Sequence, residues 1–369
     1  MIQMSQKRVG LVMIVKNEED NIKRALESAR PFINTWVIVD TGSTDRTMEI
    51  IREVYADISG HLFERPWVNF GANRSEALAL AAEHMDWAIM MDADDTLEGT
   101  VPPAQLWDRT DIDGFMLTMK HGGVLHRRAQ IFRTVAGWHY EGVLHEYAVC
   151  DKGMDQTVLA ILPEETYMIT RCEGVRSKDP LKYENDAALL EKEYARDPSN
   201  KRTLFYLAQS YRDAKQVDDA LKHYRTFLEI HDAWVQERYM ALANILNLTD
   251  DMDEHMRLAW RALELCPDRL DVPFFIANQW RQQKRPLTAE LWALANAVEN
   301  RKINPNWLYI NHDINHWAFD DILSVMAYEK KDYVRAVCAA ARVVIGAPPH
   351  GRENAIHNLK LASDALNGL

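Results

Sequence analysis

The first hundred residues alternate between short, wholly apolar stretches and stretches with helical spacing, and this alternation limits the fold more than any other feature of the chain. The stretches RVGLVMIV, WVIVD and DWAIMM have the length of strands. A strand that is apolar along its whole length is buried on both faces, as in a parallel sheet. The alternation therefore predicts βαβ units. The predicted strands are 8–15, 36–40, 61–67 and 86–91. The predicted helices are 17–30 and 73–85, and the segment 41–56 is predicted to be a turn followed by a helix.

The pattern changes between residues 103 and 172, where the apolar segments become shorter and richer in aromatic and β-branched residues. Glycine turns separate these segments. Such composition is typical of antiparallel or mixed strands. We expect them to extend the sheet and to form a wall on one side of a site.

Acidic residues follow two of the predicted parallel strands. Asp40 ends the strand 36–40, and Asp92, Asp94 and Asp95 come directly after the strand 86–91. Ligands of such sheets bind just beyond the carboxyl ends of the strands. We expect these two strands to be neighbours, so that the acids meet at one edge of the sheet.

Three carboxylates at one strand end repel one another and raise one another's pKa unless a cation lies among them. Mg²⁺ and Mn²⁺ are bound by carboxylate oxygens, with water and phosphate oxygens completing the coordination shell. Side chains two residues apart in an extended chain point the same way, so Asp92 and Asp94 can converge on one ion. The alternative is a polar turn in which Asp94 and Asp95 cap the following segment together with Thr96.

The segment VDTGSTDRT, residues 39–47, predicts a tight turn at Gly42 followed by a capped helix. The exposed amides of that helix could meet an anion. Asp40 is placed to accept a hydrogen bond from the N–H edge of a nucleobase. The alternative is a strand–turn–helix connection without a ligand. The chain has neither GxGxxG nor GxxxxGK[ST], so the common dinucleotide and P-loop fingerprints are absent.

Two further segments carry candidate functional residues. Arg74 begins the predicted helix 73–85, where its charge opposes the helix dipole, so a phosphate or carboxylate partner is expected. In WHYEGVLHEY, His145 is a candidate metal ligand or pyrophosphate contact, and Glu146 or Glu141 a candidate general base. The alternative for His145 is an ordinary half-buried side chain beside aromatic residues.

Beyond residue 180 the spacing of apolar residues is helical throughout, and it repeats. The offset from 204 to 239 and from 239 to 274 is close to the period of tetratricopeptide helix pairs. The pattern predicts a short solenoid of helix pairs that could bind a partner or a second copy of the chain. The alternative is irregular helix packing that merely covers the first domain. The predicted domains are therefore 1–178 and 179–369. The positions that define the first repeat are Leu204, Leu207, Ala208, Tyr211, Ala220, Tyr224 and Phe227.

Composition limits the compartment and the partners. The cysteines at 150, 172, 266 and 338 form no CxxC pair, which favours free thiols in a reducing compartment. No apolar run reaches about 18 residues, so no transmembrane segment is predicted and the cytoplasm is the expected location. The formal charge of −12 disfavours long-range attraction to nucleic acid phosphates.

Five segments, in their order along the chain, resemble the large family 2 of inverting glycosyltransferases, which have the GT-A fold. The similarity runs over roughly residues 8 to 175. The segment FYLAQSYRDAKQVDDALKHY, residues 205–224, resembles a subgroup of this family with a tetratricopeptide-like helical tail. The matching segments are VKNEE (15–19), VDTGSTDRT (39–47), ANR (72–74), MDADD (91–95) and LHE (144–146).

The resemblance implies a GT-A domain over 1–178, a nucleotide-sugar donor, most often a UDP-sugar, and Mn²⁺ or Mg²⁺. Many family members have a Glu-Asp pair downstream whose aspartate is the catalytic base, but residues 96–175 contain no such pair. Glu146 is assigned as the base on position alone, with Glu141 second. The resemblance places Val15, Asn17, Glu18 and Asp40 in the nucleoside pocket, Arg74 and Asp92 near the donor, and Asp92, Asp94 and His145 at the metal.

Two other classes of function compete with this prediction. Nucleotidyl transfer also uses paired acids on a βαβ sheet, but it usually needs a basic, glycine-rich loop where this chain has the acidic VKNEED. A glycosyltransferase-like scaffold without activity would keep the fold and bind a partner through the helices. For an enzyme, the acceptor could be a glycan, a peptide or a modified nucleobase, and the helical domain could join two copies of the chain.

Overall fold

The structure is a computed structural model that describes residues 7–121, 124–171, 173–174, 176, 179–299, 304, 307, 311 and 313–368. The chain divides into two compact units, Met1–Gln216 and Val217–Leu369. The predicted domain boundary at residue 178 lies outside the described residues. The contacts group the first two helices after it with the N-terminal unit.

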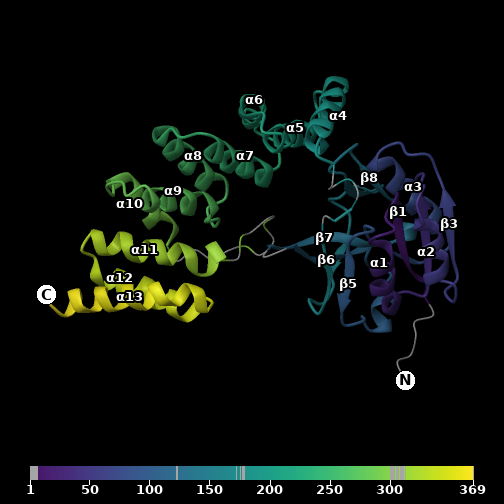
Figure 1. The fold of residues 1–369 in the computed structure, drawn as a ribbon, viewed down its shortest axis with the longest axis horizontal. Helices are drawn as coiled ribbons and strands as arrows, with labels where there is room; N and C mark the ends of the chain where they lie inside the picture. Colours follow the sequence, from purple (N-terminus) through teal and green to yellow (C-terminus); the bar gives the residue numbers. More distant parts are fainter. Residues whose placement is uncertain are drawn as a thin grey trace. The chain divides into compact units, whose positions relative to one another are not determined.

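The first four strands pair in parallel in the order β3-β2-β1-β4. Figure 1 labels β1 and β3 of this sheet. β1 lies between β2 and β4, because Val12 pairs with Val37 on one side and with Met90 on the other. The prediction that the strands before Asp40 and Asp92 are neighbours is therefore wrong. After β3 the chain crosses to the other side of β1, which creates a switch point where ligands of α/β sheets bind. The strands are β1 (Val9–Val15), β2 (Thr35–Asp40), β3 (Gly60–Glu64) and β4 (Trp87–Met90).

Side-chain alternation along β1 builds a core on each face of the sheet. Leu11 and Met13 belong to one apolar cluster and Val12 and Ile14 to the other, because successive residues of a strand point to opposite faces. Helices α1 (Ile22–Ala29) and α2 (Thr47–Val54) pack into the first cluster, and α3 (Phe70–Ala82) into the second. This double burial explains the wholly apolar strands of the sequence.

The second half of this domain continues the sheet with mixed strands, as predicted. β7 runs antiparallel to both β4 and β6, and β11 runs parallel to β6 but antiparallel to β5. The segment 138–150 instead forms a separate hairpin, β8 paired with β9. The elements are β5 (Thr96–Gly99), η2 (Ala104–Asp108), β6 (Gly114–His121), β7 (Val124–Arg133), β8 (Trp138–Glu141), β9 (Tyr147–Cys150), β10 (Leu159–Ile161) and β11 (Thr166–Ile169).

From residue 182 onward every regular element is a helix in the part of the chain that the structure describes, which confirms the all-helical prediction. All seven positions of the first predicted repeat are buried. Side chains at the helix starts cap the backbone, as Asn200 and Thr288 do. The helices are α4 (Lys182–Arg196), α5 (Lys201–Asp213), α6 (Val217–Leu228), α7 (Val235–Leu248), α8 (Met252–Leu265), α9 (Asp271–Gln282), α10 (Ala289–Val298), η5 (Ile314–Ala318), α11 (Phe319–Glu329), α12 (Tyr333–Gly346) and α13 (Pro349–Asn367).

The cysteines agree with the prediction as far as they are described. Cys150 and Cys266 are buried free thiols, Cys338 is an exposed free thiol, and position 172 lies outside the described residues. Among the described residues, the helices are too short or too polar to cross a membrane.

Candidate active site

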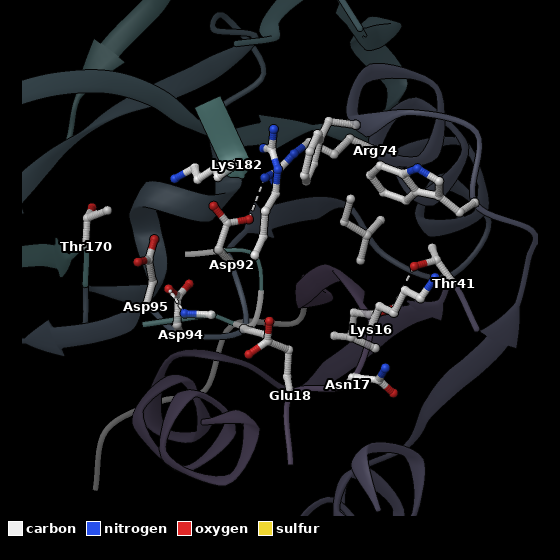
Figure 2. A pocket seen from close by; sticks show the side chains of 17 residues that line it. Lys16, Asn17, Glu18, Thr41, Arg74, Asp92, Asp94, Asp95, Thr170 and Lys182 are labelled. Atoms are coloured by element: carbon white, nitrogen blue, oxygen red, sulfur yellow. Dashed lines mark hydrogen bonds and ion pairs between the residues drawn. The ribbon is translucent and has the colours of Figure 1, made fainter. Parts of the chain in front are cut away.

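A cavity of about 440 Å³ lies beyond the carboxyl ends of β1 and β4 (Figure 2). It therefore lies at the switch point of the sheet, where this topology favours a ligand. Six of the predicted site residues line it, and Asp40, Glu141, His145 and Glu146 do not. The six are Val15, Asn17, Glu18, Arg74, Asp92 and Asp94.

Asp94 is fixed by the backbone of a distant segment. Its Oδ2 accepts hydrogen bonds from the N–H groups of Glu173, at 2.7 Å, and Gly174, at 2.9 Å. Asp95 is buried, and its Oδ1 accepts a hydrogen bond from the N–H of Arg171 at 3.2 Å, while its buried Oδ2 has no hydrogen-bond partner. The acids therefore do not simply form an exposed polar turn.

The electrostatics of this acidic cluster show a shortage of positive charge. Burial, together with the charges of Asp92 and Asp94, raises the pKa of Asp95 to about 8. Burial alone would raise the pKa of Asp92 too, but Arg74 and Arg128 outweigh it and hold that pKa below its ordinary value. A cation among these oxygens would remove the repulsion.

The carboxylates of Asp92 and Asp94 suit a hard divalent cation whose other coordination positions are filled by water and substrate oxygens. Mg²⁺ usually takes only one or two protein carboxylates. In the described part of the chain, no group of three or more His, Cys, Asp or Glu side chains is arranged to hold a metal. The predicted three-residue set of Asp92, Asp94 and His145 is thus not assembled here. The carboxylates of Asp92 and Asp94 both line the cavity, and two carboxylates are a sufficient protein donor set for a cation that also takes phosphate and water oxygens.

Arg74 is buried between two carboxylates. Its side chain is 8% exposed, and its Nη2 lies 2.5 Å from Asp92 Oδ1 while its Nε lies 2.8 Å from Glu146 Oε1. Burial alone would lower the pKa of Arg74, but Asp92 and Glu146 outweigh it and raise that pKa. The predicted carboxylate pairing is confirmed. Arg74 lies in the second turn of α3 rather than at its start, because Asn69 caps the helix earlier.

The loops after β1 and β2 hold each other in place. Asn17 has a left-handed φ of 53°, its Oδ1 accepts a hydrogen bond from Thr44 N–H at 2.7 Å, and its own N–H donates to Ser43 Oγ at 2.9 Å. Asp40 is buried, and its Oδ2 accepts hydrogen bonds from the N–H groups of Gly42 and Ser43, both at 2.9 Å. Asp40 therefore supports the turn, and the next residue along the chain lines the cavity instead.

The two candidate bases differ in position. Glu146 is 14% exposed and pairs with Arg74 at the side of the cavity. Glu141 is half exposed and accepts a hydrogen bond from Tyr147 Oη at 2.7 Å. The geometry thus brings Glu146, and not Glu141, into the charge network of Asp92.

His145 lies outside the cavity lining and packs against a helix. Its ring is stacked on the ring of Tyr206, with centroids 4.1 Å apart and planes 12° apart. Desolvation at the contact with Tyr206 and the charges of Arg202 and Arg176 lower the pKa of His145 below its ordinary value, although the residue keeps an exposed surface. The ring is therefore neutral at physiological pH.

Several lining residues were missed by the sequence reasoning. Trp67 and Phe70 form an edge-to-face pair with centroids 4.8 Å apart, and Arg176 stacks on Phe70 at 4.8 Å. The aromatic spacing WVNF was a usable signal for the first two. Nothing local marked Arg176 or Lys182, which lie beside and beyond the predicted boundary. The missed lining residues with polar or aromatic side chains are Lys16, Thr41, Trp67, Phe70, Thr170, Arg176 and Lys182.

A mixed α/β domain with strand order β3-β2-β1-β4 and paired aspartates at the end of β4 defines this unit as a GT-A-like domain. Residues 11–106 match the family model of glycosyl transferase family 2. The chain therefore carries an N-terminal glycosyltransferase family 2 domain, followed by an all-helical region.

Curated relatives match only part of the chain. A TPR repeat-containing protein of Synechococcus elongatus is 36% identical over 91 residues, which is 24% of this chain and 21% of the relative. An uncharacterized glycosyltransferase of Rickettsia typhi is 31% identical over 91 residues, which is 25% of this chain and 29% of the relative. The chain thus spans less than a third of the length of these relatives.

Solved structures with similar architecture include S. aureus TarS in complex with UDP-GlcNAc, with a TM-score of 0.36 and 15% identity over 82% of this chain and 99% of that chain. MamA has a TM-score of 0.29 and 15% identity over 53% of this chain and 96% of that chain.

Proposed function

We propose that the protein is a metal-dependent inverting glycosyltransferase that moves a sugar from a UDP-sugar to a hydroxyl group of an acceptor. The observation that carries this proposal is the cavity at the switch point, which Asp92, Asp94 and Arg74 line together. The match of residues 11–106 to the glycosyltransferase model covers the same loops. Both observations concern the binding of the sugar donor.

In this proposal the nucleoside lies against the loops after β1 and β2. Val15, Asn17 and Glu18 line that part of the cavity, and Asp40 holds the turn behind it. Asp92 is close to the ribose. The hydrogen bonds between the two loops keep these groups rigid before the donor arrives, which reduces the entropy lost on binding.

Asp92 and Asp94 would hold Mn²⁺ or Mg²⁺. Such a cation, when bound, neutralises the negative charge that grows on the diphosphate leaving group. Arg74 orients the Asp92 carboxylate through their ion pair, and the backbone of Glu173 and Gly174 orients Asp94.

Glu146 is the proposed general base. Its carboxylate takes the proton of the acceptor hydroxyl while the oxygen attacks the anomeric carbon. The bond from that carbon to the diphosphate breaks on the opposite side, so the configuration inverts. Arg74 positions the Glu146 carboxylate through their ion pair.

The test of the proposed function is calorimetric titration of UDP, UDP-glucose and UDP-N-acetylglucosamine with and without Mn²⁺. We expect all productive binding to depend on the metal, with an affinity gain of about tenfold or more, equal to about 1.4 kcal/mol. The sugar nucleotide that binds most tightly identifies the donor. A folded protein that binds none of the three would reject a UDP-sugar donor.

Replacing Glu146 by glutamine is expected to lower the rate of sugar transfer about 100-fold, because a neutral amide cannot accept the acceptor's proton. The amide has nearly the same shape as the carboxylate and keeps an oxygen beside Arg74, so donor affinity should stay within about twofold of the wild-type value. UDP release from the donor and calorimetry measure the two quantities. Glu141→Gln is the matched control and should be fully active. If instead Glu141→Gln loses activity and Glu146→Gln keeps it, Glu141 is the base.

A further inference from the structure

We infer that the first helix of the helical region, α4, belongs to the donor site, and that Lys182 binds the diphosphate group of the donor. This inference rests on the proposed function for the identity of the donor. Lys182 is the first residue of α4 and lines the same cavity as Asp92 and Asp94 (Figure 2). It thus brings a cation to the acidic end of the cavity from the far side of the predicted boundary.

Two of the other cations that line the cavity already hold carboxylates, and Lys16 is an exposed residue of the loop after β1. Arg74 pairs with Asp92 and Glu146, and Arg176 pairs with Asp186. Among the described residues no carboxylate lies in ion-pair contact with Lys182. Its ammonium lies over the ring of Tyr183 at 5.2 Å, and its charge acts on Asp186, a carboxylate that is already paired with Arg176. This half-buried ammonium is available for an anion that enters the cavity.

The position of α4 is set by specific contacts rather than by chain connectivity alone. Arg176 stacks on Phe70 of α3 and pairs with Asp186 of α4, whose side chain is 8% exposed. A second set of contacts joins α5 to the loop that carries Glu146. Tyr206 stacks on His145, and Arg202 donates a hydrogen bond to the His145 carbonyl at 3.4 Å. Both helices therefore belong to the catalytic unit.

The chemistry of this end of the cavity selects a phosphate group. A lysine ammonium acts as a compact point charge, which suits phosphate oxygens that carry spread negative charge. The diphosphate has to lie near Asp92 and Asp94 if it shares a cation with them, and Lys182 lines the same cavity. A nucleoside is uncharged and would gain nothing from this lysine. A catalytic domain that ended at residue 178 would lack the Lys182 ammonium.

The test compares Lys182→Ala with Lys182→Arg in the full chain, and Lys192→Ala, an exposed lysine on the same helix, is the matched control. Calorimetry with Mn²⁺ present measures the affinity for UDP and for inorganic pyrophosphate. We expect Lys182→Ala to weaken both about tenfold, Lys182→Arg to weaken them about threefold at most, and Lys192→Ala to leave them unchanged. The thermal unfolding midpoints should agree within about 1 °C, which separates lost binding from lost structure.

The outcomes separate this inference from the proposed function. Wild-type affinity of Lys182→Ala for UDP and pyrophosphate overturns the inference and leaves the transferase proposal intact. A lowered unfolding midpoint in both Lys182 variants, with the same loss of affinity in each, assigns a structural role and also overturns it. If the wild-type protein binds pyrophosphate but no UDP compound, the UDP-sugar proposal fails, while a tenfold loss in Lys182→Ala still supports the phosphate contact. A wild-type protein that binds neither overturns both.

Discussion

Replacing Asp94 by asparagine is expected to reduce sugar transfer about 1000-fold, a loss of about 4 kcal/mol of transition-state stabilisation. Asp94 contributes a negative charge at the proposed cation site. Its Oδ2 also accepts hydrogen bonds from the backbone of Glu173 and Gly174. The asparagine side chain keeps an oxygen that can accept those bonds, so the local fold should survive while the charge is lost. The transfer rate at saturating donor and Mn²⁺ is the primary measurement.

Thermal unfolding supplies a second readout that does not depend on turnover. Mn²⁺ with UDP should raise the unfolding midpoint of the wild-type protein, because a ligand that binds only the native state stabilises it. The same addition should leave the midpoint of Asp94→Asn nearly unchanged. Asp57→Asn removes an exposed carboxylate that pairs with Arg30 and serves as the control. Full activity of Asp94→Asn with Mn²⁺ would show that this residue is not a metal ligand.

Replacing Arg74 by methionine is expected to destabilise the N-terminal unit by about 3 kcal/mol, because it leaves the Glu146 carboxylate largely buried without its cation. The side chains of Arg74 and Glu146 are 8% and 14% exposed, so water can replace little of the lost interaction. Asp92 loses its partner too but is 37% exposed and suffers less. The same change should abolish donor binding, since Asp92 is no longer oriented. Urea unfolding and calorimetry measure the two effects.

A double variant tests the stated cause of that instability. Arg74→Met combined with Glu146→Gln removes the unpaired carboxylate as well as the cation, so it should be about 1 kcal/mol more stable than Arg74→Met alone. Arg74→Lys keeps the charge without the planar fork and should lie between wild type and Arg74→Met. If the double variant is less stable than Arg74→Met, the loss comes from packing against Tyr140 instead of from charge.

Much of the site's chemistry could be read from short stretches of sequence. The acids at 92 and 94 follow an apolar strand, and the arginine at 74 was predicted at a helix start, where its charge would need an anionic partner. Both signals depend only on neighbours along the chain. The structure confirms that these residues line one cavity and that Arg74 holds a carboxylate.

Other parts of the prediction needed long-range information. The strand order needed such information, because a run of apolar residues predicts a strand but does not predict that β4 pairs with β1 on the side away from β2. The role of Asp40 needed it too. The backbone geometry after β2 decides which groups its carboxylate meets: Oδ2 accepts hydrogen bonds from its own turn, and the buried Oδ1 has no hydrogen-bond partner. His145 likewise acquired its partner from α5, more than fifty residues away.

The sequence by itself determined the elements and the charges, because the periods of apolar residues are local properties of helices and strands. The sequence was sufficient to predict the parallel strands, the aspartates at the end of β4 and the all-helical second half. Only the tertiary structure decided which charges meet. Glu146 reaches Arg74 across the separate β8–β9 hairpin, and Lys182 reaches the cavity on a helix beyond the predicted boundary. Contacts between distant segments depend on packing and register, and no local pattern encodes these.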